Sequence, residues 1–445
     1  MFVALAAATP EARGADAATD ASAVMVVKPV QELTLPEPDA EAWFGATLAS
    51  DGDTLMVGAR GAYQHPWTWS SGAVNIFSES ATGFSWDQQF LVSYDAFGEI
   101  FGTHVAFSGD LAAISSSYFF GSSGSIRGWV HVLRRSDVGW ERCCGLNPGY
   151  PEGLGAFGAS LAIVGDAVAA GAPSADVSGG EQSGSVLIYE SPSSGHVPEP
   201  VRLVDAGAEA YAGFGNTLAA LGSDTLFVAE PNADVGGNQD EGSVFVYVRS
   251  DAGWVLQQRI EAPDPEPSLY FGQALAVSGS TLLVACAPPQ LENRRVFVFA
   301  ENGGVWEPAA VLQQPPGGAL SSRLAVDGSR AAVAGYKLDD SGFPAGWEVY
   351  VFEQSGAVWS LRAKLLPPGT IADREGVGSV ALRGDTVVVG VPNATVGGQQ
   401  DQGAVYVYRV GAAVGVPTLQ TGGLILLILL LVSSGVAVLA ANHRG

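Results

Sequence analysis

Three loops of similar composition carry the side chains best suited to bind a metal ion. They comprise residues 174–186, 232–244 and 393–405, and each places Asp, Asn or Gln around a Gly-Gly pair. The second loop carries Asp234, Asn238, Asp240 and Glu241. Their oxygen atoms could wrap a Ca²⁺ ion, which takes six to eight oxygen ligands. Asn, Asp and Gly also favour tight turns, so the sequence allows either a calcium site or a turn in this loop.

Other segments that resemble functional motifs are interpreted as parts of a repeat. Residues 153–158 fit G-x-G-x-x-G, but a strand pattern follows them where a dinucleotide site requires a helix. The tripeptide Arg383-Gly384-Asp385 occupies the same turn as Gly52-Asp53. No G-x-S-x-G elbow of a serine hydrolase is present. The histidines have no partner at metal-ligand spacing: His65, His104, His131, His196 and His443. The sequence therefore predicts a protein that is not an enzyme.

The cysteines also indicate no specific chemistry. Cys143 and Cys144 are adjacent, and Cys286 stands far from both. Three cysteines at this spacing form neither a disulfide framework nor a metal-ligand pattern. We interpret them as small residues on or near strands, with a disulfide as the alternative.

These candidate residues lie within a unit of roughly 57 residues that recurs seven times, and a fixed period of this size indicates a repeat architecture. Phe-Gly pairs at Phe44, Phe101, Phe157, Phe214 and Phe271 stand 57, 56, 57 and 57 residues apart. Two degenerate copies follow at Ser321-Ser322 and Val377-Gly378.

Each unit contains four short runs rich in β-branched and aromatic residues, separated by Gly, Asp and Ser. In the fourth unit the runs cover residues 214–221, 225–229, 242–247 and 254–260. The fourth run opens on a Trp in five units, and His196 occupies that position in the third. Four strands per repeat indicate the blade of a β-propeller. We therefore predict an all-β, seven-bladed β-propeller of four-stranded blades over residues 24–410.

The seventh unit ends after its third run, so its fourth strand must come from elsewhere. Residues 30–36 resemble the fourth strand at 256–263. Pro36 precedes Phe44 by 8 residues, and Pro263 precedes Phe271 by 8 residues. We therefore expect the N-terminal strand to close the ring, which would remove the free sheet edges.

The repeat closely resembles the FG-GAP repeat, which combines Phe-Gly with a later Gly-Asp-Thr and Gly-Ala/Val-Pro. The two later elements are seen at residues 384–392, and at 165–173 with Gly-Asp in place of Gly-Asp-Thr. The resemblance covers about residues 24–410 and implies the propeller of integrin α subunits and of bacterial surface proteins. Integrin propellers bind Ca²⁺ through an Asp-x-Asp-x-Asp-Gly pattern, which is absent here. The resemblance implies fold more strongly than function.

The two ends of the chain suggest export. Residues 1–23 read as an export signal or a disordered leader, with a small-x-small pattern at Ala15-Asp16-Ala17. Residues 422–441 are 20 residues without a charge and predict a single transmembrane helix, followed by the short tail 442–445 with Arg444. The linker 411–421 carries Val416, Pro417, Thr418 and Leu419, which resemble the IPTL-CTERM sorting signal of Gram-negative bacteria.

That resemblance implies an exosortase-type processing enzyme as partner and anchoring in the inner membrane before processing. Val416 replaces the usual Ile, and Gly422 stands where Trp is usual. A permanent anchor and a buried hydrophobic helix are the alternatives. The localisation expected is therefore the cell envelope, its outer surface or the medium.

The composition excludes one class of partner. Lys plus Arg is 21 and Asp plus Glu is 45, which gives a formal charge of −24. Nucleic-acid binding requires a basic footprint, so no nucleic acid is expected as a partner.

Together these features predict a non-catalytic exported propeller that acts as a binding or adhesion scaffold for a protein or a glycan. Trp67 and Trp69 lie in a loop and are candidate contact residues. No cofactor is required in this interpretation, although Ca²⁺ is possible. A calcium-dependent, integrin-like adhesion module is the first alternative. A propeller hydrolase or lyase, with carboxylates converging at the mouth of the ring, is the second.

Overall fold

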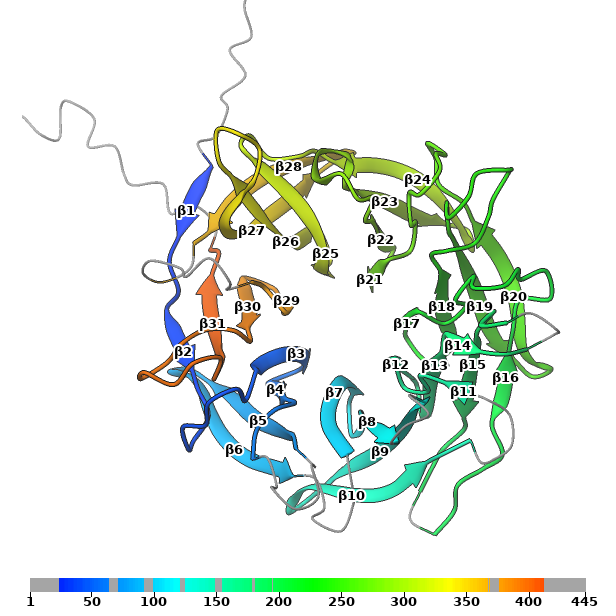
Figure 1. The fold of residues 1–445 in the computed structure, drawn as a ribbon, viewed down its shortest axis with the longest axis horizontal. Coiled ribbons are helices and arrows are strands. Elements are labelled where there is room, and N and C mark those ends of the chain that lie inside the picture. The colour runs from blue at the N-terminus through cyan, green and yellow to red at the C-terminus, as the bar shows by residue number, and fades with distance from the viewer. Residues whose placement is uncertain are drawn as a thin grey trace, which may run out of the picture. The chain divides into compact units, whose positions relative to one another are not determined.

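The computed structural model describes residues 24–63, 71–91, 99–120, 125–148, 154–177, 181–193, 195–366, 368 and 376–411. Within these residues, seven antiparallel sheets follow one another around a ring (Figure 1). Each sheet has four strands in the order expected of a propeller blade, apart from one added strand in the sixth. The predicted seven-bladed β-propeller is therefore confirmed.

The strands of the first three blades follow the repeat. Blade 1 consists of β3 (Phe44–Asp51), β4 (Thr54–Ala59), β5 (Ala73–Ser80) and β6 (Gly83–Leu91). Blade 2 consists of β7 (Glu99–Ser108), β8 (Leu111–Phe120), β9 (Ser125–Ser136) and β10 (Gly139–Leu146). Blade 3 consists of β12 (Ser160–Val164), β13 (Ala167–Ala172), β15 (Ser185–Tyr189) and β16 (Val201–Leu203), with a short ladder of β11 (Leu154–Gly155) and β14 (Ser174–Ala175).

The other four blades repeat the arrangement. Blade 4 consists of β17 (Thr217–Leu221), β18 (Thr225–Glu230), β19 (Ser243–Ser250) and β20 (Gly253–Ile260). Blade 5 consists of β21 (Ala274–Ser278), β22 (Thr281–Cys286), β23 (Arg295–Asn302) and β24 (Val305–Leu312), with the 3₁₀ helix η2 (Leu291–Asn293). Blade 6 consists of β25 (Gly318–Asp327), β26 (Arg330–Leu338), β27 (Pro344–Ser355), β28 (Val358–Leu365) and β1 (Met25–Val27). Blade 7 consists of β29 (Ser379–Arg383), β30 (Thr386–Val391), β31 (Ala404–Arg409) and β2 (Gln31–Leu33).

The N-terminal segment closes the ring as predicted. Strand β2 pairs antiparallel with β31, with Gln31 opposite Val407 and Leu33 opposite Val405. The preceding strand β1 pairs parallel with β28 of blade 6, a contact that the repeat did not predict. The start of the chain therefore joins two blades that lie at the other end of the sequence.

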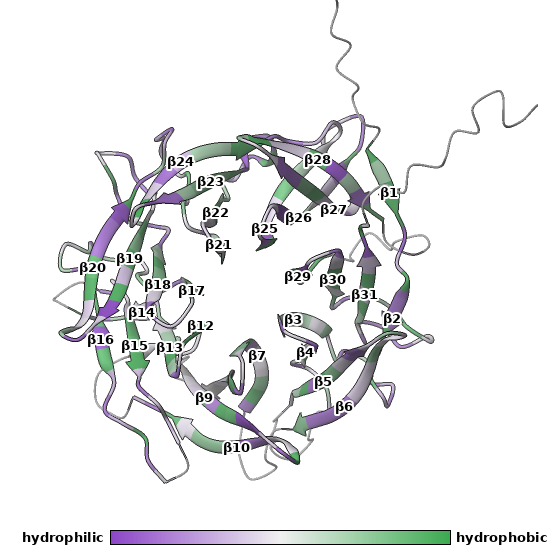
Figure 2. Ribbon diagram, turned by 180° about the vertical axis from the view of Figure 1, so that it is seen from behind, coloured by the Kyte–Doolittle hydropathy of each residue, from purple (hydrophilic) through white to green (hydrophobic). Residues whose placement is uncertain are grey.

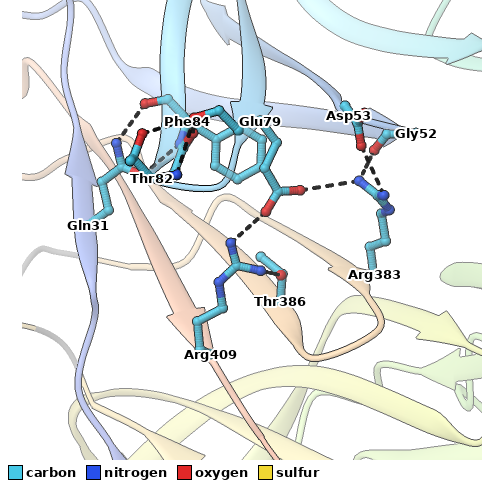
Figure 3. Close-up of polar contacts among 11 residues, drawn as sticks. Gln31, Gly52, Asp53, Glu79, Thr82, Phe84, Arg383, Thr386 and Arg409 are labelled. Atoms are coloured by element: carbon cyan, nitrogen blue, oxygen red, sulfur yellow. Dashed lines mark hydrogen bonds and ion pairs between the residues drawn. The ribbon is translucent and has the colours of Figure 1, made fainter.

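Polar contacts join blade 7 to blade 1 at this closure (Figure 3). Arg383 contacts the Gly52 carbonyl oxygen and the carboxylates of Asp53 and Glu79, the last two at 3.1 and 3.2 Å. Arg409 of β31 also pairs with Glu79 of β5. Although exposed ion pairs contribute little individually, this network shares carboxylates between the first and last blades.

The Phe-Gly pairs have a packing role. The Phe side chains are buried, with Phe44, Phe101, Phe214 and Phe271 at 0% exposure. The glycine of the pair has a positive φ, +89° at Gly45, and a Cβ there would lie 2.9 Å from the Ala404 carbonyl oxygen of the neighbouring blade. A side chain at this position would push the two blades apart, so a Phe-Gly pair marks an inter-blade contact in the five units that contain it.

The core lies between adjacent sheets. Phe227 of blade 4 and Trp306 of blade 5 meet edge to face with ring centroids 5.2 Å apart, within a cluster that both blades contribute to. The outermost strands mix hydrophilic with hydrophobic residues, as the colours along β6, β16 and β20 show in Figure 2, and many of their residues are exposed. The middle strands, such as β4 and β30, are buried throughout.

Several predictions fall outside the described residues. These are the leader at 1–23, the sorting motif at Val416–Leu419 and the helix at 422–441. Among the described residues, no helix has the length and hydrophobicity for a membrane crossing. One boundary prediction was wrong: the outer strand of blade 3 begins at Val201, because His196 lies in a turn whose backbone pairs with Ser193.

Candidate functional site

The antiparallel order of the strands gives the propeller two different faces. One face, here called the turn face, carries the short turns between first and second strands, such as Gly52-Asp53 and Gly384-Asp385. The other, the loop face, carries the longer segments between second and third strands and the segments that lead into the next blade. The loops at 231–242 and 392–403 and the segment 261–271 lie on the loop face.

Backbone hydrogen bonds interlock neighbouring loops on the loop face. The loop of blade 4 accepts bonds from the segment that enters blade 5: Ser268 N to Gln239 O at 2.7 Å and Tyr270 N to Asp240 O at 3.0 Å. The same pairing recurs between other blades, as Tyr211 N to Glu181 O and Trp43 N to Asp401 O. The loop face is therefore a continuous hydrogen-bonded surface at these blades.

The four candidate metal ligands are held by one another and by the loop backbone. Asn238 Nδ2 donates to Glu241 Oε2 at 2.7 Å, and Asp240 N donates to Asp234 Oδ1 at 2.9 Å. Glu241 is buried, at 1% exposure. Desolvation and the negative charge of Asp234 raise the pKa of Asp240. Among the described residues, no group of three His, Cys, Asp or Glu side chains has a geometry suited to a metal ion.

The equivalent aspartate in blade 3 makes the same contact. Asp176 Oδ1 accepts a bond from the Gln182 backbone N at 2.8 Å, as Asp234 does from Asp240. In the third loop, Asn393 Nδ2 donates to Asp401 Oδ1 at 3.4 Å. These contacts show the oxygen side chains stabilising turns, which is one of the two roles that the sequence allowed.

The predicted contact residues Trp67 and Trp69 lie outside the described residues. The structure identifies two other exposed aromatic side chains on the loop face, Tyr211 at 52% exposure and Phe343 at 67%. Asp339 Oδ1 accepts bonds from the Ser341 and Phe343 backbone N atoms, which fixes the loop that presents Phe343. An aromatic residue within a polar loop is the sequence signal for both positions.

A hollow of about 470 Å³ opens at the loop-face mouth of the central channel. Its charged side chains are Arg60, which follows β4, and Arg323 of β25. His104 of β7 also lines it. Although His104 is accessible to solvent in the mouth, desolvation by the channel wall and the charges of Arg323 and Arg60 lower its pKa to about 4. Sequence analysis did not single out the two arginines.

Other titratable groups are sealed inside blades. His131 Nε2 lies 2.6 Å from Glu99 Oε1, and both side chains are buried. Burial lowers the pKa of His131 despite the Glu99 hydrogen bond. Glu230 is 1% exposed, and burial together with the charge of Asp205 raises its pKa to about 8. A substrate approaching from either face would not reach these groups.

The two motif-like segments take their places in the repeat. Arg383 donates a hydrogen bond to the Gly52 carbonyl oxygen of blade 1, and Asp385 forms an ion pair with Arg330 of blade 6. The Arg-Gly-Asp tripeptide is therefore engaged in inter-blade contacts. Of the G-x-G-x-x-G segment, residues 154–158 are described; they form β11 and a turn, and strand β12 follows from Ser160.

The cysteines are free thiols in the described structure. A β-bulge between Arg142 and Cys144 brings Cys143 Sγ to 3.2 Å from Cys144 Sγ. Burial and the hydrogen bond with Cys143 raise the pKa of Cys144 to about 12. A thiol with a raised pKa is a poor nucleophile at neutral pH.

Comparison with known proteins identifies one repeat directly. The FG-GAP repeat family model matches residues 359–408, which extend from β28 to β31. This match and the ring of seven blades support an FG-GAP propeller. No curated protein matches the sequence.

Solved structures are similar to this chain only at low identity. One is the β-propeller domain of the Trilobed protease from Pyrococcus furiosus, with 10% identity, a TM-score of 0.44, and 82% of this chain and 95% of that chain covered. An acylaminoacyl peptidase complex has 10% identity, a TM-score of 0.43, and 83% and 52% covered. The Pyrococcus horikoshii acylaminoacyl peptidase has 8% identity, a TM-score of 0.43, and 82% and 51% covered. The chain thus spans about half the length of the two peptidases, and none of these likenesses bears on activity.

Proposed function

We propose that this FG-GAP propeller is an exported or cell-surface scaffold that binds a protein or a glycan through its loop face and has no catalytic activity. The observation that supports the proposal is the interlocking of the loops. Because the loops of blades 3, 4 and 7 are bonded to the segments entering the next blades, as in Phe271 N to Glu241 O at 2.8 Å, this part of the surface is ordered before a ligand arrives. A preorganised surface loses less conformational entropy on binding.

The exposed aromatic side chains are the expected contact residues. Tyr211 and Phe343 project from hydrogen-bonded segments of the loop face. Aromatic side chains supply large contact areas and are enriched among the residues that dominate binding energies. Trp67 and Trp69, which stand between β4 and β5 in the sequence, are proposed as further contact residues.

The absence of catalysis is proposed from where the titratable groups lie. His131 and Glu230, whose pKa values are shifted, are buried within blades, and no Asp or Glu lines the hollow that contains His104. The proposed localisation rests on the C-terminal residues 411–445, whose processing by an exosortase-type enzyme would release the propeller or transfer it to the outer surface.

The test is direct binding of the full chain in mild detergent to a glycan array and to separated cell-envelope proteins. The double variant Tyr211→Ala with Phe343→Ala should lose the captured ligand, and Trp67→Ala with Trp69→Ala should weaken it. Val138→Ala is the control, because Val138 is 83% exposed in a turn on the opposite face. Equal capture by all variants would contradict a loop-face site. Turnover of the captured ligand by the parent would contradict the non-catalytic proposal.

A further inference from the structure

One position of the first strand recurs in every blade and lines the mouth of the channel in blades 1, 2, 5, 6 and 7. This position lies one residue before a paired residue of the first strand: Thr47 before Leu48, His104 before Val105 and Arg323 before Leu324. The equivalents in the other blades are Ser160, Thr217, Ala274 and Ser379. Five of the seven positions therefore carry small side chains, whereas blades 2 and 6 carry His104 and Arg323.

The small side chains of this ring have a structural role. Ser160 Oγ donates to the Gly215 carbonyl oxygen at 2.7 Å, and Ser379 Oγ donates to the Gly45 carbonyl oxygen at 2.8 Å. Each bond joins one blade to the Phe-Gly pair of the next. A guanidinium replaces that hydroxyl at Arg323, so blade 6 carries a charge at the mouth where blades 3 and 7 carry an inter-blade hydrogen bond.

The two arginines at the mouth differ from the arginines of the propeller that form ion pairs. Arg249, Arg330 and Arg383 each contact carboxylates of their own or a neighbouring blade. Among the described residues, Arg60 and Arg323 have no carboxylate within ion-pair distance, and no Asp or Glu lines the hollow. In a chain with 45 acidic and 21 basic residues, a concave site with cationic side chains alone is an exception.

Contacts around the hollow favour an anion over other ligands. Arg60 lies over the Trp43 ring at 5.1 Å, a cation–π contact that orients its side chain. Two guanidinium groups in one hollow repel each other, and an oxyanion between them relieves this repulsion while accepting charge-assisted hydrogen bonds. Thr47, Thr103 and Asn393 add hydroxyl and amide groups to the lining. The volume of about 470 Å³ lies within the usual range for small-molecule sites.

We propose that Arg60 and Arg323 form a binding site for an oxyanion at the loop-face mouth of the channel. The ligand is a carboxylate, sulfate or phosphate, either free or carried on an acidic sugar. The proposal deepens the scaffold function and rests on it, because the site opens on the face through which the propeller is proposed to bind.

The test uses calorimetric titration of the full chain in mild detergent with sodium sulfate and with digalacturonate, at constant ionic strength. We expect saturable binding of at least one probe. Arg60→Gln and Arg323→Gln should each weaken it at least about tenfold, whereas Arg135→Gln should leave it unchanged. Arg135 is an exposed arginine on β9 next to a turn of the opposite face, so its variant removes the same charge. Because all three arginines are exposed, the variants should fold, which thermal melts would verify.

The two probes separate the possible sources of the anion. Binding of sulfate alone would identify a small free anion as the ligand, and binding of digalacturonate alone would identify an acidic sugar. A second readout is the His104 ring in NMR spectra, whose pKa should rise when an anion neutralises the neighbouring arginines. No saturable binding of either probe up to ~10 mM, or binding by the double variant Arg60→Gln with Arg323→Gln that equals binding by the parent, would overturn the proposal. Loop-face capture that persists in that case would leave the scaffold function intact.

Discussion

The Gln31 carboxamide pairs with the backbone of Phe84 in the way that a neighbouring strand would. Gln31 Nε2 donates to the Phe84 carbonyl oxygen at 2.7 Å, and Gln31 Oε1 accepts from the Phe84 N at 2.9 Å (Figure 3). The same pair of bonds joins Gln88 to Trp140 and Gln258 to Trp306. A glutamine on the outer strand of one blade thus links it to the outer strand of the next at three blade interfaces.

Removal of the Gln31 carboxamide should destabilise the ring closure. Gln31→Ala would break two hydrogen bonds, each with a net contribution of about 0.5–1.5 kcal/mol, so we expect the free energy of unfolding to fall by about 1–3 kcal/mol. Urea denaturation of the full chain measures this change. Glu32→Ala is the control, because Glu32 is the exposed neighbour in the same strand. Equal midpoints for the two variants would show that the carboxamide contributes nothing to closure.

Much of the fold could be predicted because the repeat imposes the same packing seven times. Each buried Phe and the glycine beside it mark an inter-blade contact, so their spacing reveals the number of blades. The equal distances from Pro36 to Phe44 and from Pro263 to Phe271 likewise placed the closing strand, which pairs with β31 as expected.

The rest depends on contacts that a repeat pattern does not encode. Strand β1 adds only three residues to β28, and its sequence, Met25–Val27, does not specify a partner. The cationic mouth is recognisable only when the units are aligned in structural register, since Arg323 belongs to a unit that lacks the Phe-Gly pair. Asp234 could not be assigned a role from sequence, because the same oxygen atoms serve a turn or a metal ion.

Calcium should have no effect on the stability of the propeller. Asp234 and Glu241 already accept bonds from Asp240 N and Asn238 Nδ2, so a cation would have to displace contacts within the loop. We expect the same melting temperature for the full chain in millimolar Ca²⁺ and in EDTA. A filled site at 100 times its dissociation constant would add about 2.7 kcal/mol. A higher melting temperature in Ca²⁺ than in EDTA, if it is lost in Asp234→Asn, would instead support the calcium-dependent adhesion module.

Stability should fall with rising pH because of Glu230. Its carboxylate oxygens are buried and have no hydrogen-bond partner within the described structure, and its pKa is raised from 4.5 to about 8. The folded state therefore binds more protons than the unfolded state between these values, and stability declines across that window. Near the lower end of this window, Glu230→Gln and the parent should have the same free energy of unfolding.

Above the lower end of this pH window, Glu230→Gln should become more stable than the parent, by up to about 1.4 kcal/mol per pH unit as the pH approaches 8. Urea denaturation at several pH values measures the difference. Glu261→Gln removes an exposed carboxylate just after β20 of the same blade, and its pH profile should follow that of the parent. Parallel profiles for Glu230→Gln and the parent would mean that Glu230 is ionised throughout the range.

The glycine of a Phe-Gly pair should be far less replaceable than the glycine of a turn. Gly215 and Gly222 both have positive φ, at +86° and +64°. A Cβ on Gly215 would lie 2.7 Å from the Ser185 carbonyl oxygen of the preceding blade, whereas a Cβ on Gly222 would meet nothing within 4 Å. Gly222→Ala should lower the free energy of unfolding by about 1–2 kcal/mol, because alanine must adopt the left-handed backbone conformation.

Gly215→Ala should carry that same backbone cost and an additional packing cost of about 1–3 kcal/mol, because the two blades must separate to admit the methyl group. The free energies of unfolding from urea denaturation test both values. If the two variants lose the same stability, the Phe-Gly pair requires glycine only for its backbone conformation. A larger loss for Gly215→Ala would show that the pair sets the distance between blades, which is the physical reason that it recurs at a fixed period.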